Sequence, residues 1–204
     1  IWRGGETSVE PELEDVLIEN GRIVSVGLLS GVADADVIDA ADMLVMPGLV
    51  NAHFHSPVNH MKGALPSLPL ELFMLYESPA NEALRPTPRE AYVRTLLACL
   101  EMIRNGVTAV QDDAFFVPYP EPAIIDAVLQ AYEDSGLRAR VALDQSDVAE
   151  ADKLPFLDQI MNDNQRRRLA EKPKVGSEQL LEFYDHLISR WHGAAGGRIR
   201  AAVS

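Results

Sequence analysis

Two histidines separated by one residue are the first feature of this sequence that could do chemistry. His53 and His55 flank Phe54 at the end of the apolar run 44–52. Because alternate residues of a β-strand share a face, both imidazoles would lie on one face and Phe54 on the other. Two such imidazoles can bind one divalent cation, and imidazole suits zinc or iron. Structural histidines are the commoner alternative, but α/β folds collect ligand sites at the ends of buried strands, which favours a metal site here.

The segment after this pair carries residues that could contact a substrate. Asn59 and His60 could hydrogen-bond the edge of a heterocycle, and Phe73 belongs to an apolar stretch that could line an aromatic pocket. Simple solvation of the polar residues, and a core or subunit contact for the apolar stretch, are open alternatives. Asp112, near the end of a later strand, could support a metal-bound histidine, although capping and turn formation are commoner roles.

Alternating strands and helices must position these residues. Buried apolar runs near 44–52, 107–111, 137–143 and 198–203 predict four strands. Helices between strands indicate an α/β fold with a parallel sheet and right-handed crossovers. Four parallel strands suit either a small open sheet or half of an eight-stranded (β/α) barrel, and periodicity does not separate the two.

The helices between these strands have recognisable ends. Thr87-Pro88-Arg89-Glu90 has the spacing of a capping box, and Gly106 is placed to close the helix that it begins. Apolar faces at 124–132 and 180–191 predict two more helices, the second of them capped by Ser177.

The first 45 residues predict short strands instead. Runs at 16–18 and 23–26 flank Asn20-Gly21, a strong hairpin signal, and 36–39 and 43–46 are further candidates. A unit this small cannot bury both of its faces alone, so we expect it to be part of a larger β-structure.

Composition excludes several classes of protein. The 204 residues include 18 Lys and Arg against 31 Asp and Glu, a net charge of −13, which disfavours nucleic acid as a partner. The strongest apolar run, 43–50, is far shorter than the roughly 20 residues that span a bilayer. A single cysteine, Cys99, excludes an internal disulfide and suggests a reducing compartment, which predicts a cytoplasmic protein.

The stretch Pro47-Gly48-Leu49-Val50-Asn51-Ala52-His53-Phe54-His55 resembles the segment that opens the barrel of the metal-dependent amidohydrolases. Residues 15–27 resemble that family's N-terminal β-sandwich, and 105–110, 136–141 and 197–203 resemble its second, third and fourth barrel strands. The resemblance implies two domains. Residues 1–45 would be a partial β-sandwich completed by C-terminal residues outside this chain, and residues 46–204 would be the first half, strands 1–4, of a (β/α)8 TIM-type barrel.

The branch most similar to this chain comprises the guanine, cytosine and thioadenosine/S-adenosylhomocysteine deaminases and the triazine hydrolases. It implies one divalent metal, zinc before iron, held by His53 and His55 together with a His on strand five and an Asp on strand eight. Catalytic residues would lie on strands five, six and eight, outside this chain, so we expect the chain alone to be inactive. His186 and His192 fall on or just after a predicted helix and are not assigned as ligands.

The activity implied is hydrolytic deamination of a small heterocyclic amine, such as a purine, pterin, pyrimidine or triazine, by an enzyme that is a homo-oligomer when complete. Hydrolytic dechlorination and cyclic-amide hydrolysis are alternatives within the family, and a non-catalytic α/β module is an alternative outside it. No single substrate is favoured by the sequence. Neither nucleic acid nor a membrane is expected as a partner.

Overall fold

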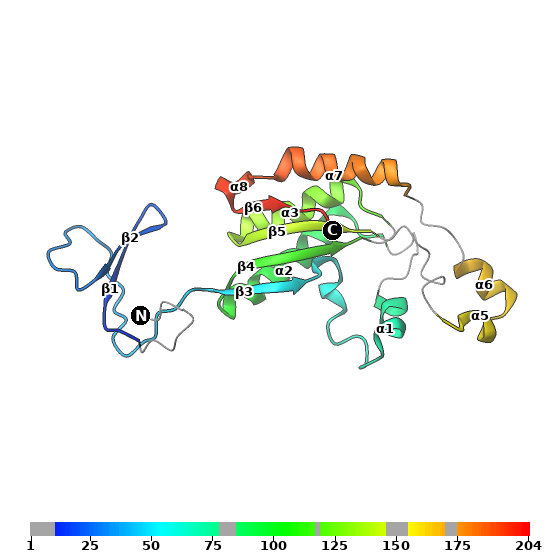
Figure 1. Cartoon of the computed structure of the whole chain (residues 1–204), viewed down its shortest axis with the longest axis horizontal. Coiled ribbons are helices and arrows are strands. Elements are labelled where there is room, and N and C mark those ends of the chain that lie inside the picture. The colour runs from blue at the N-terminus through cyan, green and yellow to red at the C-terminus, as the bar shows by residue number, and fades with distance from the viewer. Residues whose placement is uncertain (1–10, 78–84, 117–118, 146–154, 170–174) are drawn as a thin grey trace. The chain divides into compact units, whose positions relative to one another are not determined.

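The structure is a computed structural model that describes residues 11–77, 85–116, 119–145, 155–169 and 175–204 (Figure 1). It divides into two compact units, residues 1–48 and residues 49–204. Within the described ranges, no helix combines the length and the apolar character needed to cross a membrane.

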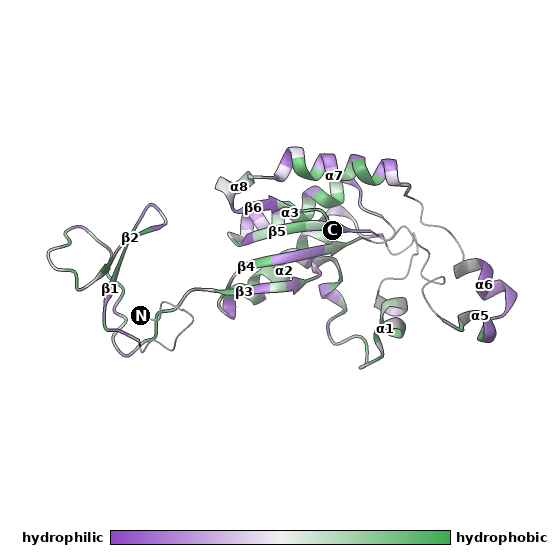
Figure 2. Cartoon of the chain, viewed as in Figure 1, coloured by the Kyte–Doolittle hydropathy of each residue, from purple (hydrophilic) through white to green (hydrophobic). Residues whose placement is uncertain are grey.

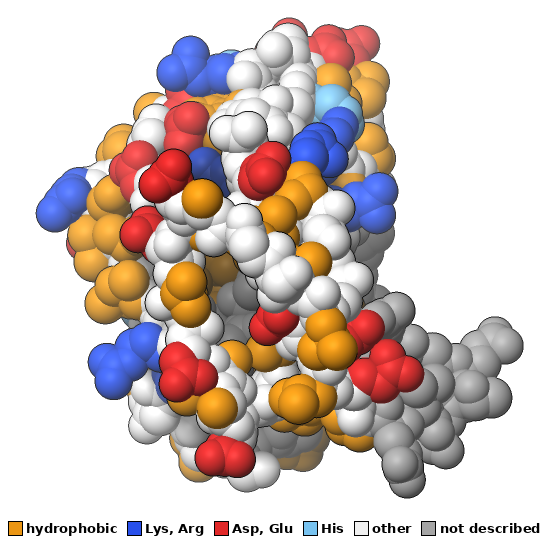
Figure 3. Space-filling view, turned by 90° about the vertical axis from the view of Figure 1, so that its left-hand side faces the viewer, with side chains coloured by type: hydrophobic (Ala, Val, Ile, Leu, Met, Phe, Trp, Pro, Cys, Tyr) orange, Lys and Arg blue, Asp and Glu red, His pale blue; other side chains and the backbone are white. Residues whose placement is uncertain are grey.

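The first unit contains one β-hairpin. Strand β1 (Asp15–Glu19) pairs antiparallel with β2 (Arg22–Gly27), and Asn20 and Gly21 form the turn with φ of 51° and 73°. Positive φ at both turn residues is what the favoured two-residue hairpin requires, so this prediction is confirmed. The candidates 36–39 and 43–46 are not strands in the structure, because neither is paired in a ladder. On this hairpin the side chains of Ile18 and Ile23 are 62% and 66% exposed. The space-filling view in Figure 3 shows exposed hydrophobic side chains scattered among charged ones.

The second unit is built on a parallel sheet of four strands, as predicted. The strands are β3 (Leu49–Phe54), β4 (Val107–Phe115), β5 (Arg138–Asp144) and β6 (Ile199–Ala201), and they are neighbours in chain order. Strand β3 begins later than the apolar run 44–52 suggested, since the ladder with β4 starts at Leu49. It also extends through Phe54.

Three long helices connect the strands, namely α2 (Pro88–Arg104), α3 (Pro122–Ser135) and α7 (Ser177–Trp191). The predicted capping box is confirmed: Glu90 N donates to Thr87 Oγ1 at 3.2 Å, and Thr87 N donates to the Glu90 carboxylate at 2.7 Å. The cap predicted at Ser177 is wrong. Gly176 is the N-cap and Ser177 is already helical, without a side-chain capping bond, because the chain enters the helix one residue earlier.

Shorter elements fill the connections. A 3-10 helix, η1 (Ser56–Met61), directly follows the histidine pair, and α1 (Leu70–Glu77) comes after it. The insertion after β5 contains α5 (Leu157–Ile160) and α6 (Asp163–Leu169), and α8 (Ala194–Gly197) precedes β6.

One core cluster joins α2, α3 and α7 to alternate residues of the strands. On β4, Val110, Asp112 and Ala114 are buried, and they alternate with the half-buried Gln111 and Asp113. On α7, hydrophobic residues alternate with hydrophilic ones along the helix, as the colouring in Figure 2 shows. The sheet therefore has one face packed by helices, whereas the other face carries polar side chains at the end where the histidine pair lies.

Candidate metal centre

The end of β3 and the first residue after it bring the two predicted ligands together. The ring centroids of His53 and His55 lie 4.9 Å apart, with the ring planes at 89° to each other. Phe54, between them, is half-buried and packs against the core under the helices. The pairing of β3 with β4 shifts register between Asn51 and Phe54, so Ala52 and His53 of β3 stand opposite Gln111 alone, and the extra residue falls at the first histidine.

A main-chain oxygen fixes the tautomer of the neutral His55 ring. Its Nδ1 lies 2.6 Å from the carbonyl oxygen of Asp113 on β4. Because a carbonyl only accepts hydrogen bonds, we assign the proton to Nδ1, which leaves Nε2 with a free lone pair. A metal-binding histidine needs this arrangement, with one ring nitrogen held by an acceptor and the other free to coordinate.

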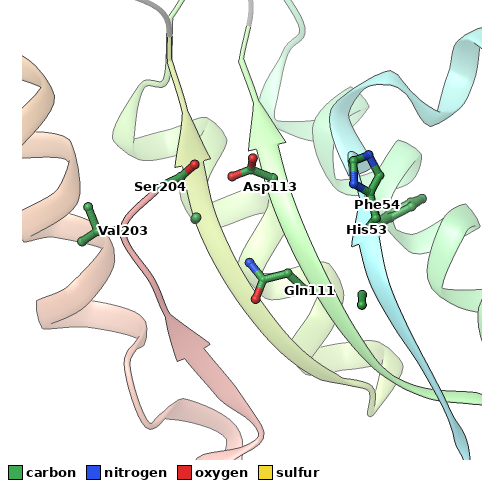
Figure 4. Close-up of a pocket in the computed structure, with 8 residues that line it drawn as sticks. His53, Phe54, Gln111, Asp113, Val203 and Ser204 are labelled. Atoms are coloured by element: carbon green, nitrogen blue, oxygen red, sulfur yellow. The ribbon is translucent and has the colours of Figure 1, made fainter.

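A small pocket at the polar face of the sheet is lined by His53 but not by His55. It has a volume of about 200 Å³. Figure 4 shows His53, Gln111 and Asp113 on neighbouring strands at this pocket. The lining residues are Ala52, His53, Phe54, Gln111, Asp113, Ala142, Val203 and Ser204.

Asp112 makes no hydrogen bond to either imidazole among the described residues. Its carboxylate is fully buried on the helix-covered face, where it accepts hydrogen bonds from Ser56 N at 2.9 Å and from the Tyr132 hydroxyl at 2.8 Å. Burial raises the pKa of the Asp112 carboxyl, and the bonds from Ser56 and Tyr132 oppose that shift. Burial likewise raises the pKa of Tyr132 well above its usual value, so the hydroxyl keeps its proton. The contact that supports His55 directly comes from the next residue, Asp113.

The three predicted substrate contacts lie elsewhere. Asn59 and His60 belong to η1, and Phe73 belongs to α1. Partial burial, followed by the charge of Arg94, lowers the pKa of His60. None of the three lines the pocket described above, so their role stays a prediction.

The remaining histidines are part of the helical layer. His186 Nε2 lies 2.8 Å from the Asp126 carboxylate, which ties α7 to α3, and His192 is the C-cap of α7. Over the described part of the chain, no group of three or more His, Cys, Asp or Glu side chains could hold a metal ion. Two imidazoles such as those of His53 and His55 amount to half of a tetrahedral zinc shell.

Comparison with known proteins gives the family of the chain. The sequence profile of the amidohydrolase family matches residues 44–202, which include β3, the histidine pair and all four parallel strands. This chain belongs to the amidohydrolase family. The resemblance noted in the sequence is thereby confirmed.

Two relatives are deaminases. The chain is 33% identical over 186 residues to a 5'-deoxyadenosine deaminase of Methanosarcina mazei, covering 91% of the chain and 35% of the relative. It is 35% identical over 193 residues to a 5-methylthioadenosine/S-adenosylhomocysteine deaminase of Desulforudis audaxviator, covering 93% and 37%. The chain of this amidohydrolase thus spans about a third of the length of these curated relatives.

Two solved structures share the fold. The zinc complex of atrazine chlorohydrolase from Arthrobacter aurescens has a TM-score of 0.72 at 23% identity, covering 98% of this chain and 43% of that one. A zinc-bound adenosine deaminase from Xanthomonas campestris has a TM-score of 0.62 at 24% identity, covering 96% and 38%. This amidohydrolase chain therefore has the α/β architecture of those enzymes over nearly its whole length.

Proposed function

We propose that the complete protein is a metal-dependent hydrolytic deaminase of a small heterocyclic amine, and that His53 and His55 bind its single divalent ion, zinc. The observation that carries this proposal is the Nδ1 contact of His55 with the Asp113 carbonyl, which leaves Nε2 free beside the ring of His53. The deaminases and zinc-bound structures named above support the choice of reaction and of metal.

The strand order supports a barrel. In the open doubly wound sheets that bind nucleotides, the strand order reverses at the ligand site, whereas the strands of a (β/α) barrel follow one another in chain order. Strands β3, β4, β5 and β6 are neighbours in chain order and are joined through helices. We therefore assign residues 46–204 to strands 1–4 of a TIM-type barrel and residues 1–45 to a partial β-sandwich. The histidine pair lies at the carboxyl end of the first barrel strand, where barrel enzymes place their active sites.

Zinc held by the pair would supply a Lewis acid that activates water for attack on a ring carbon. The residues of this chain supply binding and orientation. His53 and His55 hold the ion, while Asp113 and Gln111 offer a carboxylate and an amide at the pocket, which can hydrogen-bond ring nitrogens or an exocyclic amine. Proton transfer is assigned to a Glu after the strand-five His, and orientation of substrate and water to a strand-six His, of the complete protein.

The proposal extends to the setting of the enzyme. The buried free Cys99 supports a cytoplasmic location, where thiols stay reduced. The exposed Leu70 and Tyr76 of α1 support a subunit contact in a homo-oligomer. A small heterocycle is the expected partner.

The test is release of ammonia by the complete protein from a panel of purine nucleosides, pterins, pyrimidines and aminotriazines, with chlorotriazines assayed for chloride. We expect ammonia from at least one amine, and we expect His55→Ala to lower kcat/KM at least about a hundredfold, since second-shell changes alone cost 10–100-fold. His186→Ala, on the helical layer, is the control and should retain activity. No ammonia from any compound would contradict the deaminase assignment, and chloride release alone would replace it with dechlorination.

A further inference from the structure

Asp112 is a buried carboxylate that the proposed chemistry does not use. An ionised carboxylate is costly to remove from water unless several donors meet it. Asp112 is fully buried, and two donors converge on it from different elements: the first N–H of η1 and the hydroxyl of Tyr132 on α3. Burying this carboxylate costs free energy, and it contacts η1, which directly follows the histidine pair. Both facts suggest that Asp112 has a role at the site.

The donor on η1 belongs to the residue that follows His55. The first N–H groups of a helix have no partner inside it, and His55, the N-cap of η1, makes no side-chain capping bond. Ser56 N instead donates to Asp112 across to β4, at 2.9 Å. The carboxylate thereby caps the helix from a neighbouring strand, and it fixes the main chain at the point where the chain leaves β3.

The neighbouring ladder is irregular at this point. The register of β3 against β4 shifts between Asn51 and Phe54, so regular sheet pairing does not by itself set where His55 lies. Two consecutive residues of β4 compensate. The Asp113 carbonyl orients the His55 ring through Nδ1, and the Asp112 carboxylate holds the next residue's backbone.

Resting on the proposed metal function, we propose that Asp112, itself held by Tyr132, is a positioning residue that fixes His55 for metal binding by anchoring the Ser56 amide. The path runs from α3 through β4 to η1: the Tyr132 hydroxyl orients the carboxylate, the carboxylate holds Ser56 N, and Ser56 sets the direction of the His55 side chain. Asp112 acts through the main chain and does not touch the metal.

Two readouts on the chain test this role. Hydrogen exchange of the Ser56 amide reports the anchor directly and needs no metal. A zinc titration followed by NMR of the histidine rings gives the Kd of the pair. For Asp112→Ala we expect loss of Ser56 protection and a zinc Kd weaker by about tenfold or more. For Asp112→Asn, whose amide oxygen can still accept from Ser56 N, we expect a Kd within about threefold of the parent.

Val110→Ala is the matched control. Val110 is buried on the same face of β4 as Asp112, but its partner in the ladder is Asn51 of β3 and its side chain has no polar atom that could hold Ser56 N. It should lower stability but leave Ser56 protection and the zinc Kd unchanged. Should Asp112→Ala not fold, Tyr132→Phe removes only the hydroxyl and should weaken the zinc Kd severalfold, with partial loss of Ser56 protection.

Several results would overturn the inference. One is an unchanged zinc Kd once Ser56 protection is lost, and another is a loss of affinity in Val110→Ala equal to that in Asp112→Ala. An unchanged Kd in Tyr132→Phe with the Ser56 anchor loosened would overturn it as well. His55→Ala separates this inference from the proposed function. If His55→Ala leaves zinc binding intact, the metal site itself is wrong, whereas loss in His55→Ala without loss in Asp112→Ala rejects the positioning role alone.

Discussion

Neighbouring residues of β4 make different contacts around the histidine pair. The main-chain carbonyl of Asp113 accepts from His55 Nδ1, and the side chain of the same residue lines the pocket. The side chain of Asp112 points to the opposite face and is fully buried there. A strand places consecutive side chains on opposite faces. Two adjacent residues can therefore make both contacts: Asp113 binds the ring of His55, and Asp112 binds the backbone N–H of Ser56.

The sequence predicted the histidine pair because strand alternation is a local rule. Strand alternation predicted both imidazoles on one face, and the structure brings their ring centroids within 4.9 Å, although β3 ends at Phe54 and His55 is the N-cap of η1. The support of His55 by the Asp113 carbonyl had no signal, since every residue has a carbonyl. Tyr132 was missed because its contact with Asp112 joins residues 20 apart, and burial of its hydroxyl is a tertiary property.

The buried Asp112 makes stability depend on pH. Its folded pKa is raised above the ordinary carboxyl value of about 3.9, so the folded chain binds more protons than the unfolded chain between those two pKa values. The stabilising contribution is fully present below the unfolded pKa and is lost as pH rises through the folded pKa. Asp112→Asn does not titrate and should escape this loss.

We therefore expect the free energy of unfolding of Asp112→Asn, relative to the parent chain, to increase as pH rises from about 4 towards neutrality. Urea unfolding of both proteins over that range measures the difference. A difference that stays flat, or falls, with rising pH would show that the folded pKa of Asp112 is not raised.

At the scale of elements, helix starts were predictable where side-chain chemistry marks them. Thr87 and Glu90 form both bonds of the capping box that their spacing predicted. Ser177 has the right residue type one position too late, because Gly176 takes the N-cap. The start of β3 was placed too early for a related reason: apolar residues 44–48 continue the hydrophobic run but have no ladder partner, and pairing is not visible in one sequence.

This difference between Thr87 and Ser177 gives a matched pair of substitutions. Thr87→Ala removes a capping bond to Glu90 N and should lower the free energy of unfolding by about 1 kcal/mol. Ser177→Ala removes no capping bond and should change it by less than about 0.5 kcal/mol. Chemical denaturation of the two variants beside the parent compares them, and equal losses would contradict the assigned caps.

At the scale of the whole molecule, the sequence predicted four parallel strands and the helices between them. Periodicity left an open sheet and a half-barrel equally possible, because strand order is set by which strands pair. The structure supplies the order, with β3, β4, β5 and β6 adjacent in sequence. The family match over residues 44–202 then supports the barrel assignment that we propose.

Zinc binding by this chain alone depends on how many ligands the chain supplies. Two imidazoles are half of a tetrahedral zinc shell, so the chain should bind zinc more weakly than a site with a full set of protein ligands. The same two rings should nevertheless be the ones that respond to the metal. His60, His186 and His192 provide internal references in the same molecule.

The most direct measurement is therefore a zinc titration of the ¹⁵N-histidine-labelled chain, followed by NMR of the ring nitrogens. Before zinc is added, His55 should be the Nδ1-protonated tautomer. Added zinc should shift Nε2 of His55 together with a ring nitrogen of His53, while the other three histidines stay unchanged. A His55 protonated on Nε2 without zinc, or a response confined to the other histidines, would contradict a metal site at this pair.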